Sequence, residues 1–390
     1  MPALKILIIG SSIAGLSAAE AARAGDPDCH ITILSEDSHY PYYRQRLCEV
    51  LEDPLAKERL FLHPEEWYRE RGFDLQLNVK AAGLRPHSKE VLLADGQVCS
   101  YDKLILATGS CSYVPPTKGT DLDGVETLWT MADALRIEKR LAQAKRCIVV
   151  GGGLLGLEAA YAFHKRGLES AILERLPRLM MRQLDERSAE LFTAQVEKEG
   201  ASVTTNAYIA EIFAGENGKA AGVRLEDGSE FHADLVLISA GVHARTEMLA
   251  GSGIAVDRYV LIDSRMRTNL PDIYAAGDCA LMDKRWYGLW TVAKQQGVIA
   301  GENAAGGDRE YSMPVLPYVV NTMGTHIASA GTIEEKDLLP NQLAQLYADI
   351  MENSELFQYA KMLFVGEKLN GFILLGDTKA FASLNKKLDR

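Results

Sequence analysis

The sequence has few cysteines, and none of them lie in the close pairs that build redox or metal centres. The six are Cys29, Cys48, Cys99, Cys111, Cys147 and Cys279. Their spacing excludes a local redox disulfide and a zinc or iron–sulfur site of ordinary spacing. The eight histidines show no metal-ligand spacing either, so we predict no metal site. Free thiols are typical of a reducing compartment, and we expect a cytoplasmic protein.

Long hydrophobic runs and an excess of positive charge are also missing. The uncharged segment of residues 316–333 is interrupted by polar residues such as Asn321 and Ser329, so it is too polar to span a bilayer. The N-terminus lacks the charged and long apolar regions of a signal peptide. The net charge of −11 argues against nucleic acid or an anionic membrane as a main partner. The chain of 390 residues is long enough for two or three domains, each with a sizeable core.

A glycine-rich turn follows a mainly apolar run near the N-terminus. Residues 4–9 have the composition of a parallel strand that is buried on both faces. Gly10 and Gly15 then flank the start of an alanine-rich helical pattern, whose first N–H groups can hold a pyrophosphate. Ser12 replaces the middle glycine of this fingerprint. Glu36 ends the next predicted strand, at the spacing of an acid that accepts hydrogen bonds from a ribose.

The same pattern is repeated about 140 residues later. This second copy keeps all three glycines and begins its helical pattern with Leu154; its turn residues are Gly151, Gly153, Leu154 and Gly156. One copy suggests a protein that holds a dinucleotide. Two copies suggest a protein that holds two dinucleotides and passes electrons between them.

The second copy also carries an acid at the ribose position. Glu174 ends the predicted strand of residues 170–173, and an acid there favours a free 2′-hydroxyl over a 2′-phosphate. We therefore predict NADH rather than NADPH. Arg175 and Arg178 lie close by in the sequence and could weaken this preference.

Each copy is followed by a further matching segment. An Asp-Gly turn at residues 95–96 precedes an apolar strand that ends in Gly109, and the same turn at residues 227–228 precedes a strand that ends in Gly241. Glycine at a strand end lets the backbone approach a bound ligand closely. The matching order of turn, strand and glycine indicates two homologous nucleotide-binding domains of the α/β class.

Segments outside the glycine turns resemble the FAD/NAD-dependent pyridine nucleotide–disulfide oxidoreductase superfamily. They are residues 39–47, 106–110, 179–185, 268–278 and 290–297. The resemblance covers about residues 3–330 and is strongest for NADH:rubredoxin reductases and for the N-terminal flavoprotein part of nitrite reductase large subunits.

The resemblance implies a domain organisation. An FAD-binding domain of the Rossmann-like, glutathione reductase type would comprise residues 1–112 and 242–308, with a Rossmann-like NAD(H)-binding domain of residues 113–241 inserted in it. Residues 309–390 would form a small α+β domain, since their alternating apolar runs predict strands with a turn between them and a closing helix. In the family this region caps the flavin or forms a dimer interface, and we expect a monomer or a homodimer.

The resemblance also implies which residues bind each cofactor. For FAD they are Gly10, Ser12, Ala14, Gly15, Glu36, Arg44, Ala107, Thr108, Gly109, Gly277, Asp278, Trp290 and Thr291. For NADH they are Gly151, Gly153, Leu154, Gly156, Glu174 and Gly241. Asp278 would bond the ribityl chain. A helix that starts near Trp290 would direct N–H groups to flavin N1 and O2, where negative charge develops on reduction. For Arg44, a flavin contact and a surface salt bridge stay open as alternatives.

These assignments predict an NAD(P)H-dependent FAD oxidoreductase that prefers NADH. Hydride would pass from NADH to FAD, and electrons would then pass to a small redox protein such as rubredoxin. Disulfide reductases of the superfamily carry a cysteine pair near the flavin and a C-terminal histidine that serves it, and this chain has neither. Electrons are therefore expected to leave the flavin directly. Some relatives have a lysine shortly after the Pro-Tyr segment, where this chain has Glu49.

Two other functions stay open from the sequence. The chain could be a single-cysteine NADH peroxidase or a related thiol-flavin reductase, because Cys48 lies a turn past the Pro-Tyr segment. The usual Cys-Gly pattern of such enzymes is missing. The chain could also be a regulatory subunit that binds flavin and NADH and turns over slowly.

Overall fold

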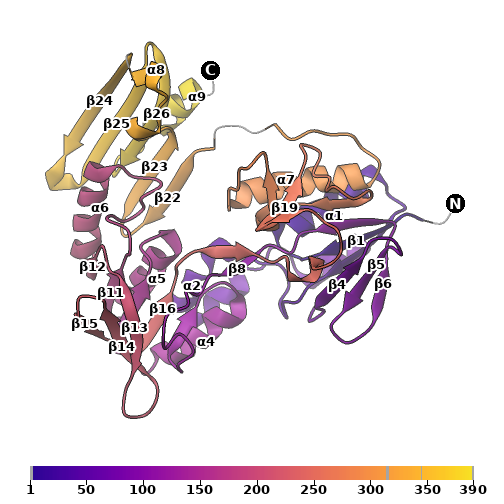
Figure 1. The fold of residues 1–390 in the computed structure, drawn as a ribbon, viewed down its shortest axis with the longest axis horizontal. Helices are drawn as coiled ribbons and strands as arrows, with labels where there is room; N and C mark the ends of the chain where they lie inside the picture. Colours follow the sequence, from indigo (N-terminus) through magenta and orange to yellow (C-terminus); the bar gives the residue numbers. More distant parts are fainter. Residues whose placement is uncertain (1–2, 313–315, 344, 389–390) are drawn as a thin grey trace.

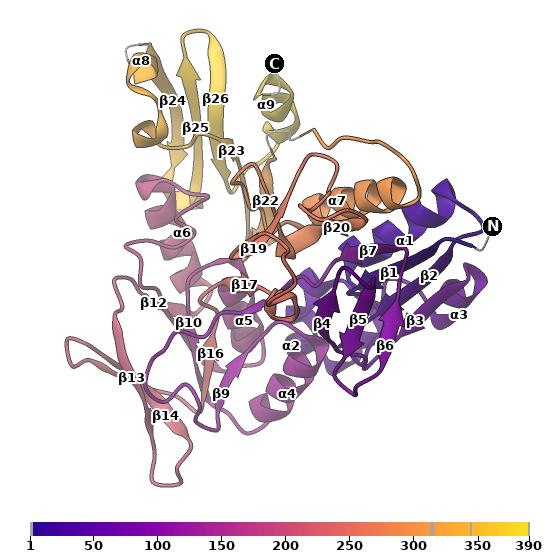
Figure 2. The ribbon, with the colours of Figure 1, turned by 45° about the vertical axis from the view of Figure 1, so that its right-hand side comes forward.

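The computed structural model describes residues 3–312, 316–343 and 345–388. Two five-stranded parallel sheets and one five-stranded antiparallel sheet form its framework. We call the first sheet with its helices the first unit, the second sheet with its helices the second unit, and the antiparallel sheet the C-terminal sheet. Figures 1 and 2 show the C-terminal sheet beside the second unit and the N-terminus on the far side of the first unit.

The sheet of the first unit has the strand order β20-β7-β1-β2-β3. Its strands are β1 Lys5–Ile9, β2 His30–Leu34, β3 Phe73–Gln76, β7 Lys103–Leu106 and β20 Ile273–Ala275. The long helices α1 (Ile13–Gly25) and α7 (Trp290–Ala304) pack against each other and against this sheet. The central strand β1 is buried from Ile6 to Ile9, as its apolar composition predicts.

The sheet of the second unit has the equivalent order, β9-β16-β10-β11-β12. Its strands are β9 Val125–Thr127, β10 Arg146–Val150, β11 Glu169–Leu173, β12 Ala201–Thr204 and β16 Leu235–Ile238. Its helices are α4 Met131–Leu141, α5 Leu154–Lys165 and α6 Glu186–Lys198. The two sheets differ in one respect. The strand at the equivalent edge is β20 in the first unit, which follows the whole second unit in the chain, whereas β9 precedes the other strands of its sheet.

Each unit also carries a three-stranded antiparallel sheet, which follows β3 in the first unit and β12 in the second. These strands are β4 Ala81–Arg85, β5 Glu90–Leu93 and β6 Val98–Ser100 in the first unit, and β13 Ile209–Ala214, β14 Ala220–Leu225 and β15 Glu230–His232 in the second. The Asp-Gly turns predicted at residues 95–96 and 227–228 connect β5 to β6 and β14 to β15. The repeat seen in the sequence is therefore a repeat of structure.

Two antiparallel segments connect the units. Strand β8 (Ser110–Ser112) leads from the first unit to the second, and β17 (Val242–Ala244) leads back and pairs with it. The remaining elements of the first unit are short: α2 Cys48–Glu52, α3 Glu65–Glu70, β18 Val256–Asp257, β19 Tyr259–Ile262 and β21 Ala280–Met282. Short 3₁₀ helices lie at Arg44–Arg46, Pro54–Arg59, Glu247–Leu249, Gly277–Cys279, Glu335–Asp337 and Ser354–Leu356.

The C-terminal sheet has the order β22-β23-β26-β25-β24. Its strands are β22 Tyr318–Thr322, β23 Thr325–Gly331, β24 Leu346–Asn353, β25 Gln358–Val365 and β26 Lys368–Leu375, with the helices α8 Pro340–Leu343 and α9 Phe381–Leu388. Helix α9 covers one face, and α6 of the second unit packs against the other. Strands β25 and β26 and helix α9 correspond to the strands with a turn between them and the closing helix that the sequence predicts.

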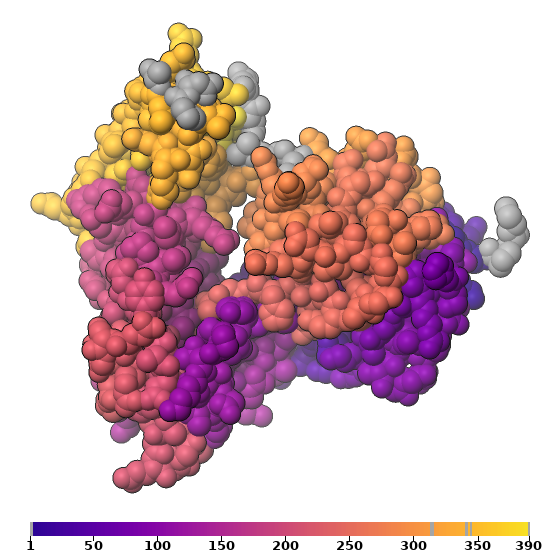
Figure 3. Space-filling view, in the orientation of Figure 1, coloured from indigo at the N-terminus to yellow at the C-terminus, as the bar shows by residue number. Residues whose placement is uncertain are grey.

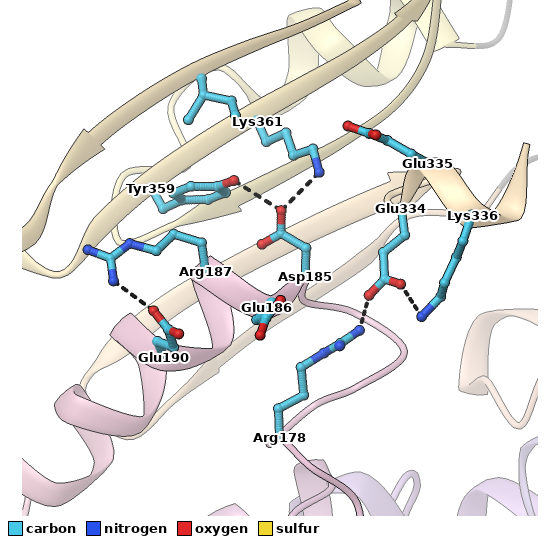
Figure 4. A pocket seen from close by; sticks show the side chains of 11 residues that line it. Arg178, Asp185, Glu186, Arg187, Glu190, Glu334, Glu335, Lys336, Tyr359 and Lys361 are labelled. Carbon is cyan, nitrogen blue, oxygen red and sulfur yellow. Dashed lines mark hydrogen bonds and ion pairs between the residues drawn. The ribbon is translucent and has the colours of Figure 1, made fainter. Parts of the chain in front are cut away.

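An ion pair joins the C-terminal sheet to the start of α6. The Asp185 carboxylate caps α6 and accepts hydrogen bonds from Tyr359 Oη and Lys361 Nζ, both at 3.0 Å. Arg178 and Glu334 form a second pair across the same junction. Figure 4 shows these side chains around an open cavity of about 630 Å³. The segment of residues 179–185, which resembles the family, therefore ends at an anchored position.

One apolar core joins residues of all three predicted domains. This core contains Leu51 of α2, Phe163 of α5, Phe192 of α6 and Ile373 of β26, so it includes residues of both units and of the C-terminal sheet. Figure 3 shows the second unit and the C-terminal sheet as one lobe, next to the lobe of the first unit. The division of the chain at residues 112, 241 and 308 stays a prediction.

Helices α1 and α7 cross at glycines, and we expect Gly301→Ala to destabilise the protein by about 2 kcal/mol. A Cβ at Gly301 would lie 2.1 Å from the carbonyl oxygen of Ala18, which is backbone and cannot rotate away. Urea unfolding measures the change. The control is Lys294→Ala on the exposed face of α7, which should leave the unfolding midpoint nearly unchanged. Equal midpoints for Gly301→Ala and wild type would contradict the close crossing.

Candidate nucleotide-binding sites

The two glycine turns have the same geometry. Gly10 N donates to Leu34 O at 2.8 Å, and Gly151 N donates to Leu173 O at 2.9 Å. Both glycines have positive φ, +110° and +117°. A Cβ at Gly10 would lie 2.1 Å from Ala107 O, and one at Gly151 would lie 2.3 Å from Ser239 O. Only glycine fits either position, as the fingerprint predicts.

The last glycine of each turn lets the helix approach the strand. A Cβ at Gly15 would lie 1.9 Å from Gly10 O, and one at Gly156 would lie 2.2 Å from Gly151 O. Ser12 and Gly153 are the equivalent N-cap residues of α1 and α5, and both have extended backbone. No described atom lies within 4 Å of a Cβ built at Gly153. The start of α5 therefore has open space beside its N-cap residue, whereas the predicted contact Leu154 is partly buried against the apolar core.

Three helix starts are suited to hold an anion. Among the described residues no side chain caps α1, α5 or α7, and the first turn of each contains no acidic residue. By contrast, α4 is capped by Thr130 with Asp133 in its first turn, and α6 is capped by Asp185 with Glu186. Free N–H groups and the positive end of the helix dipole attract phosphate, whereas a nearby carboxylate repels it. The helices that the sequence assigns to the two cofactors combine both features, whereas α2 and α3 also lack a side-chain cap but carry acidic residues in the first turn.

The two ribose acids have different surroundings. Glu36 accepts hydrogen bonds from Lys80 Nζ at 2.9 Å and from an Arg245 guanidinium nitrogen at 2.7 Å. Burial alone would raise the pKa of Glu36, but these two cations outweigh it and hold the pKa below its ordinary value. Glu174 instead accepts from backbone, from Gly152 N at 2.5 Å and Leu176 N at 2.7 Å. A carboxylate has about four lone pairs, so both acids retain capacity for ribose hydroxyls.

Asp278 and Gly277 lie beside the first glycine turn. Gly277 N donates to Gln296 Oε1 at 2.9 Å, and a Cβ at Gly277 would lie 2.9 Å from the Ala14 methyl. Asp278 Oδ2 accepts from Ser110 Oγ at 2.8 Å. Burial raises the pKa of Asp278, and the Ser110 hydrogen bond and the Arg44 charge oppose this. Burying this carboxylate costs free energy, and its protein partners offset only part of that cost. The site therefore suits a ligand that donates hydrogen bonds from hydroxyl groups, as a polyol does.

The strand-end residues mark where the chain leaves each sheet. Ala107 N donates to Ile9 O at 2.8 Å, and Thr108 Oγ1 donates to Arg245 O at 2.7 Å. Gly109 and Gly241 have positive φ, and no described atom lies within 4 Å of a Cβ built at either. Both glycines therefore leave room for a ligand next to the backbone.

Aromatic side chains gather near the start of α7. The rings of Tyr43 and Trp290 are 5.8 Å apart, and Thr291 beside Trp290 is exposed. Arg44 lies with its guanidinium carbon 5.6 Å from the Tyr42 ring and 5.5 Å from the Trp129 ring. Among the described residues Arg44 has no carboxylate partner within 4 Å, so the surface salt bridge considered for it is not formed. Trp129 was not predicted as a site residue.

Cys48 is buried between α2 and α5. Its Sγ lies 4.0 Å from Leu155 O, and 6% of the residue is exposed. Burial raises the pKa of Cys48 well above its ordinary value, and the charges of Glu158, Glu52 and Glu49 add to this. All six cysteines lie within the described residues and have free thiols.

In the residues that the structure describes, no group of three or more His, Cys, Asp or Glu side chains is placed to hold a metal ion. No helix in the described part of the chain has the length and apolar composition needed to cross a membrane.

Two parallel sheets of equivalent strand order, each with a glycine turn and an uncapped helix, define an α/β protein with two dinucleotide-binding folds. The family model described as pyridine nucleotide-disulphide oxidoreductase matches residues 4–297, and the chain belongs to this family. A second model, described as the rubredoxin NAD+ reductase C-terminal domain, matches residues 319–390. The predicted superfamily, fold class and cofactors of the family, FAD and NAD(H), are thus confirmed. The individual cofactor contacts stay predictions.

Known relatives share much of the chain. A nitrite reductase [NAD(P)H] of Bacillus subtilis (strain 168) is 29% identical over 99% of this chain, which spans about half (48%) of that protein. A rubredoxin-NAD(+) reductase of Pseudomonas putida is 33% identical over 73% of this chain and 74% of its own length. The crystal structure of NADH:rubredoxin oxidoreductase from Clostridium acetobutylicum has a TM-score of 0.82 and 28% identity, covering 99% of this chain and 95% of that one.

Proposed function

We propose that this chain oxidises NADH and passes the electrons through FAD to a small redox protein such as rubredoxin. The observation that carries the proposal is the set of uncapped, acid-free helix starts at α1, α5 and α7, on two sheets of equivalent order. The match of residues 319–390 to the rubredoxin NAD+ reductase C-terminal domain supports the choice of acceptor, as do relatives of that name.

The residues of the chain hold and orient the cofactors. Bound FAD supplies the hydride acceptor and the electron donor of the reaction. The N–H groups at the start of α1 hold its pyrophosphate, and Asp278 accepts hydrogen bonds from its polyol chain. The start of α5 holds the pyrophosphate of NADH, and Glu174 accepts from a ribose hydroxyl that a 2′-phosphate would replace. Glu174 therefore favours NADH.

An anaerobic assay tests the proposal. NADH is added to the purified, FAD-loaded protein, and the flavin absorbance is followed. Bleaching within seconds is expected, and NADPH should bleach it more slowly. The reduced protein is then mixed with rubredoxin, ferredoxin, a nitrite reductase partner, peroxide and oxygen. Fast reoxidation by rubredoxin supports the proposed acceptor, whereas a protein that cannot be loaded with FAD contradicts the whole proposal.

Two alternatives have distinct outcomes in the same assay. A Cys48-dependent peroxidase would lose NADH-dependent peroxide turnover in Cys48→Ser. The burial and raised pKa of Cys48 disfavour the thiolate that such chemistry needs, so we expect unchanged turnover in this variant. A regulatory subunit would bleach over many minutes rather than seconds.

A further inference from the structure

One tryptophan of the second unit reaches into the flavin site proposed for the first unit. Trp129 lies between β9 and α4, and its backbone is held by the capping box of α4. Asp133 Oδ2 accepts from Trp129 N at 3.1 Å and from Thr130 N at 2.8 Å. The position of the indole ring is therefore set by the second unit.

The indole ring contacts two segments of the first unit. Trp129 Nε1 donates to Ser110 O at 2.6 Å, and the Ser110 hydroxyl in turn donates to Asp278 Oδ2. On its other side, the ring faces the Arg44 guanidinium, which also donates to the Trp129 carbonyl. Two predicted flavin-binding residues, Arg44 and Asp278, are thus linked through this one side chain.

A second link runs alongside the first. The buried Tyr42 hydroxyl accepts from Met131 N at 2.9 Å and donates to Asp37 Oδ2 at 2.8 Å. The Tyr42 ring forms the other wall around Arg44. The start of α4 is therefore bound to the first unit on both sides of the Arg44 guanidinium.

The geometry points to Trp129 as a positioning residue of the flavin site. It holds Arg44 and the Ser110–Asp278 pair at fixed positions relative to the NAD-binding unit. This inference rests on the proposed function. A cation beside an aromatic ring and a hydrogen bond to a buried carbonyl each stabilise one arrangement of these groups. Since the indole is attached to the second unit, the same contacts align the two proposed cofactor sites.

Trp129→Phe separates the two contacts, because phenylalanine keeps a ring beside Arg44 and removes the N–H donor. We expect about fivefold weaker FAD binding, the effect of one lost hydrogen bond. We also expect a shifted visible spectrum of the bound flavin, and a lower rate of anaerobic reduction by NADH per bound flavin. Trp129→Ala should weaken FAD binding at least tenfold, because it removes both contacts.

Trp67→Phe is the matched control. Trp67 stacks on His63 at 3.8 Å and on Arg71 at 4.1 Å, both within the first unit. Among the described residues it forms no hydrogen bond with a predicted flavin contact. This variant should retain the wild-type FAD affinity, flavin spectrum and reduction rate. Thermal unfolding of each apoprotein shows whether the variants fold. A merely structural role would lower the folded fraction without changing the spectrum or the rate per bound flavin.

A double-mutant cycle with Ser110→Ala provides a second measurement. Ser110→Ala keeps the carbonyl that Trp129 bonds and removes the hydroxyl that bonds Asp278. If Trp129 acts by positioning this hydroxyl, Trp129→Phe should have little further effect on FAD affinity in the Ser110→Ala background. Wild-type FAD affinity, spectrum and reduction rate in Trp129→Phe would overturn the inference and leave the proposed function intact. A wild-type protein that takes up no FAD would instead reject the proposed function.

Discussion

Asp278→Asn is expected to lose most of its affinity for FAD while the apoprotein keeps its stability. The carboxylate is the strongest hydrogen-bond acceptor predicted to face the polyol chain of FAD, and a hydrogen bond to a charged group contributes about 1.5–3 kcal/mol. Its loss corresponds to roughly 10- to 100-fold weaker binding. Asparagine retains an oxygen for the Ser110 hydroxyl, so the local structure is preserved. Titration of the apoprotein with FAD, followed by flavin fluorescence, measures the change.

The stability of this variant separates a binding role from a folding role. Burial raises the pKa of Asp278, so the charged carboxylate costs the folded apoprotein free energy. Removing the charge should leave the melting temperature of the apoprotein unchanged or higher. A lower melting temperature together with wild-type FAD affinity would mean that Asp278 serves the fold and not the ligand.

Asp272→Asn is the matched control, and we expect the opposite pair of results. Asp272 lies just before β20, where Lys103 Nζ at 2.5 Å and Lys89 Nζ at 2.6 Å bind its two carboxylate oxygens. Hydrogen bonds from these lysines hold the pKa of Asp272 below its ordinary value. This variant should therefore be less stable than wild type, and its affinity for FAD should be unchanged.

The residues of the two glycine turns could be predicted because their requirements are local. At Gly10, Gly15, Gly151 and Gly156 an added Cβ would lie within 2.3 Å of a backbone oxygen, so the position dictates glycine whatever the rest of the fold contains. The strand order was not predicted, because the edge strands β20 and β9 come from different places in the chain.

The contacts around these turns could not be predicted, because they join residues far apart in the sequence. Arg245 binds Glu36 across 209 positions, and Trp129 binds Ser110 across 19 positions and two strands. Neither Lys80 nor Arg245 belongs to a motif, so nothing in the sequence connects them to the ribose acid. Sequence spacing predicts the ribose acid Glu36 but does not predict which side chains bind it.

The C-terminal sheet shows a different limit of sequence patterns. Strands β25 and β26 have buried residues that mark them as strands, and both were predicted. Strand β24 is exposed along almost its whole length, so it lacks the alternation of apolar and polar residues that identifies a strand. Its pairing with β25 is a property of the folded sheet.

Glu158→Gln is expected to stabilise the protein at pH 8 and to have little effect at pH 5. Burial, reinforced by the carboxylates of Glu49 and Glu52, raises the pKa of Glu158 from 4.5 to about 7. Between these two values the folded state keeps a proton that the unfolded chain has released. The stability due to this group therefore falls as pH rises from 4.5 to 7, by at most about 3 kcal/mol, and is constant above pH 7. Glutamine cannot ionise, so this loss should disappear.

The groups around Glu158 come from three elements. On α2, Glu49 pairs with Arg46, which precedes the helix, and Glu52 pairs with Lys165 of α5, so both carboxylates are partly neutralised. Tyr318 of β22 lies on the third side, where burial and the Glu158 charge raise its pKa. Because burial is the larger cause at Glu158, Glu49→Gln should reduce the pH dependence of stability without abolishing it.

Urea unfolding of wild type and variants at pH 5, 6, 7 and 8 measures these effects. Asp234→Asn is the control, since Asp234 accepts hydrogen bonds from Lys145 N and Arg146 N. Burial would raise the pKa of Asp234, but these bonds hold it below its ordinary value. Its contribution to stability is lost only at pH values below that ordinary value, so Asp234→Asn should be less stable by the same amount at all four pH values. A Glu158→Gln curve parallel to wild type would show that another group titrates in this window.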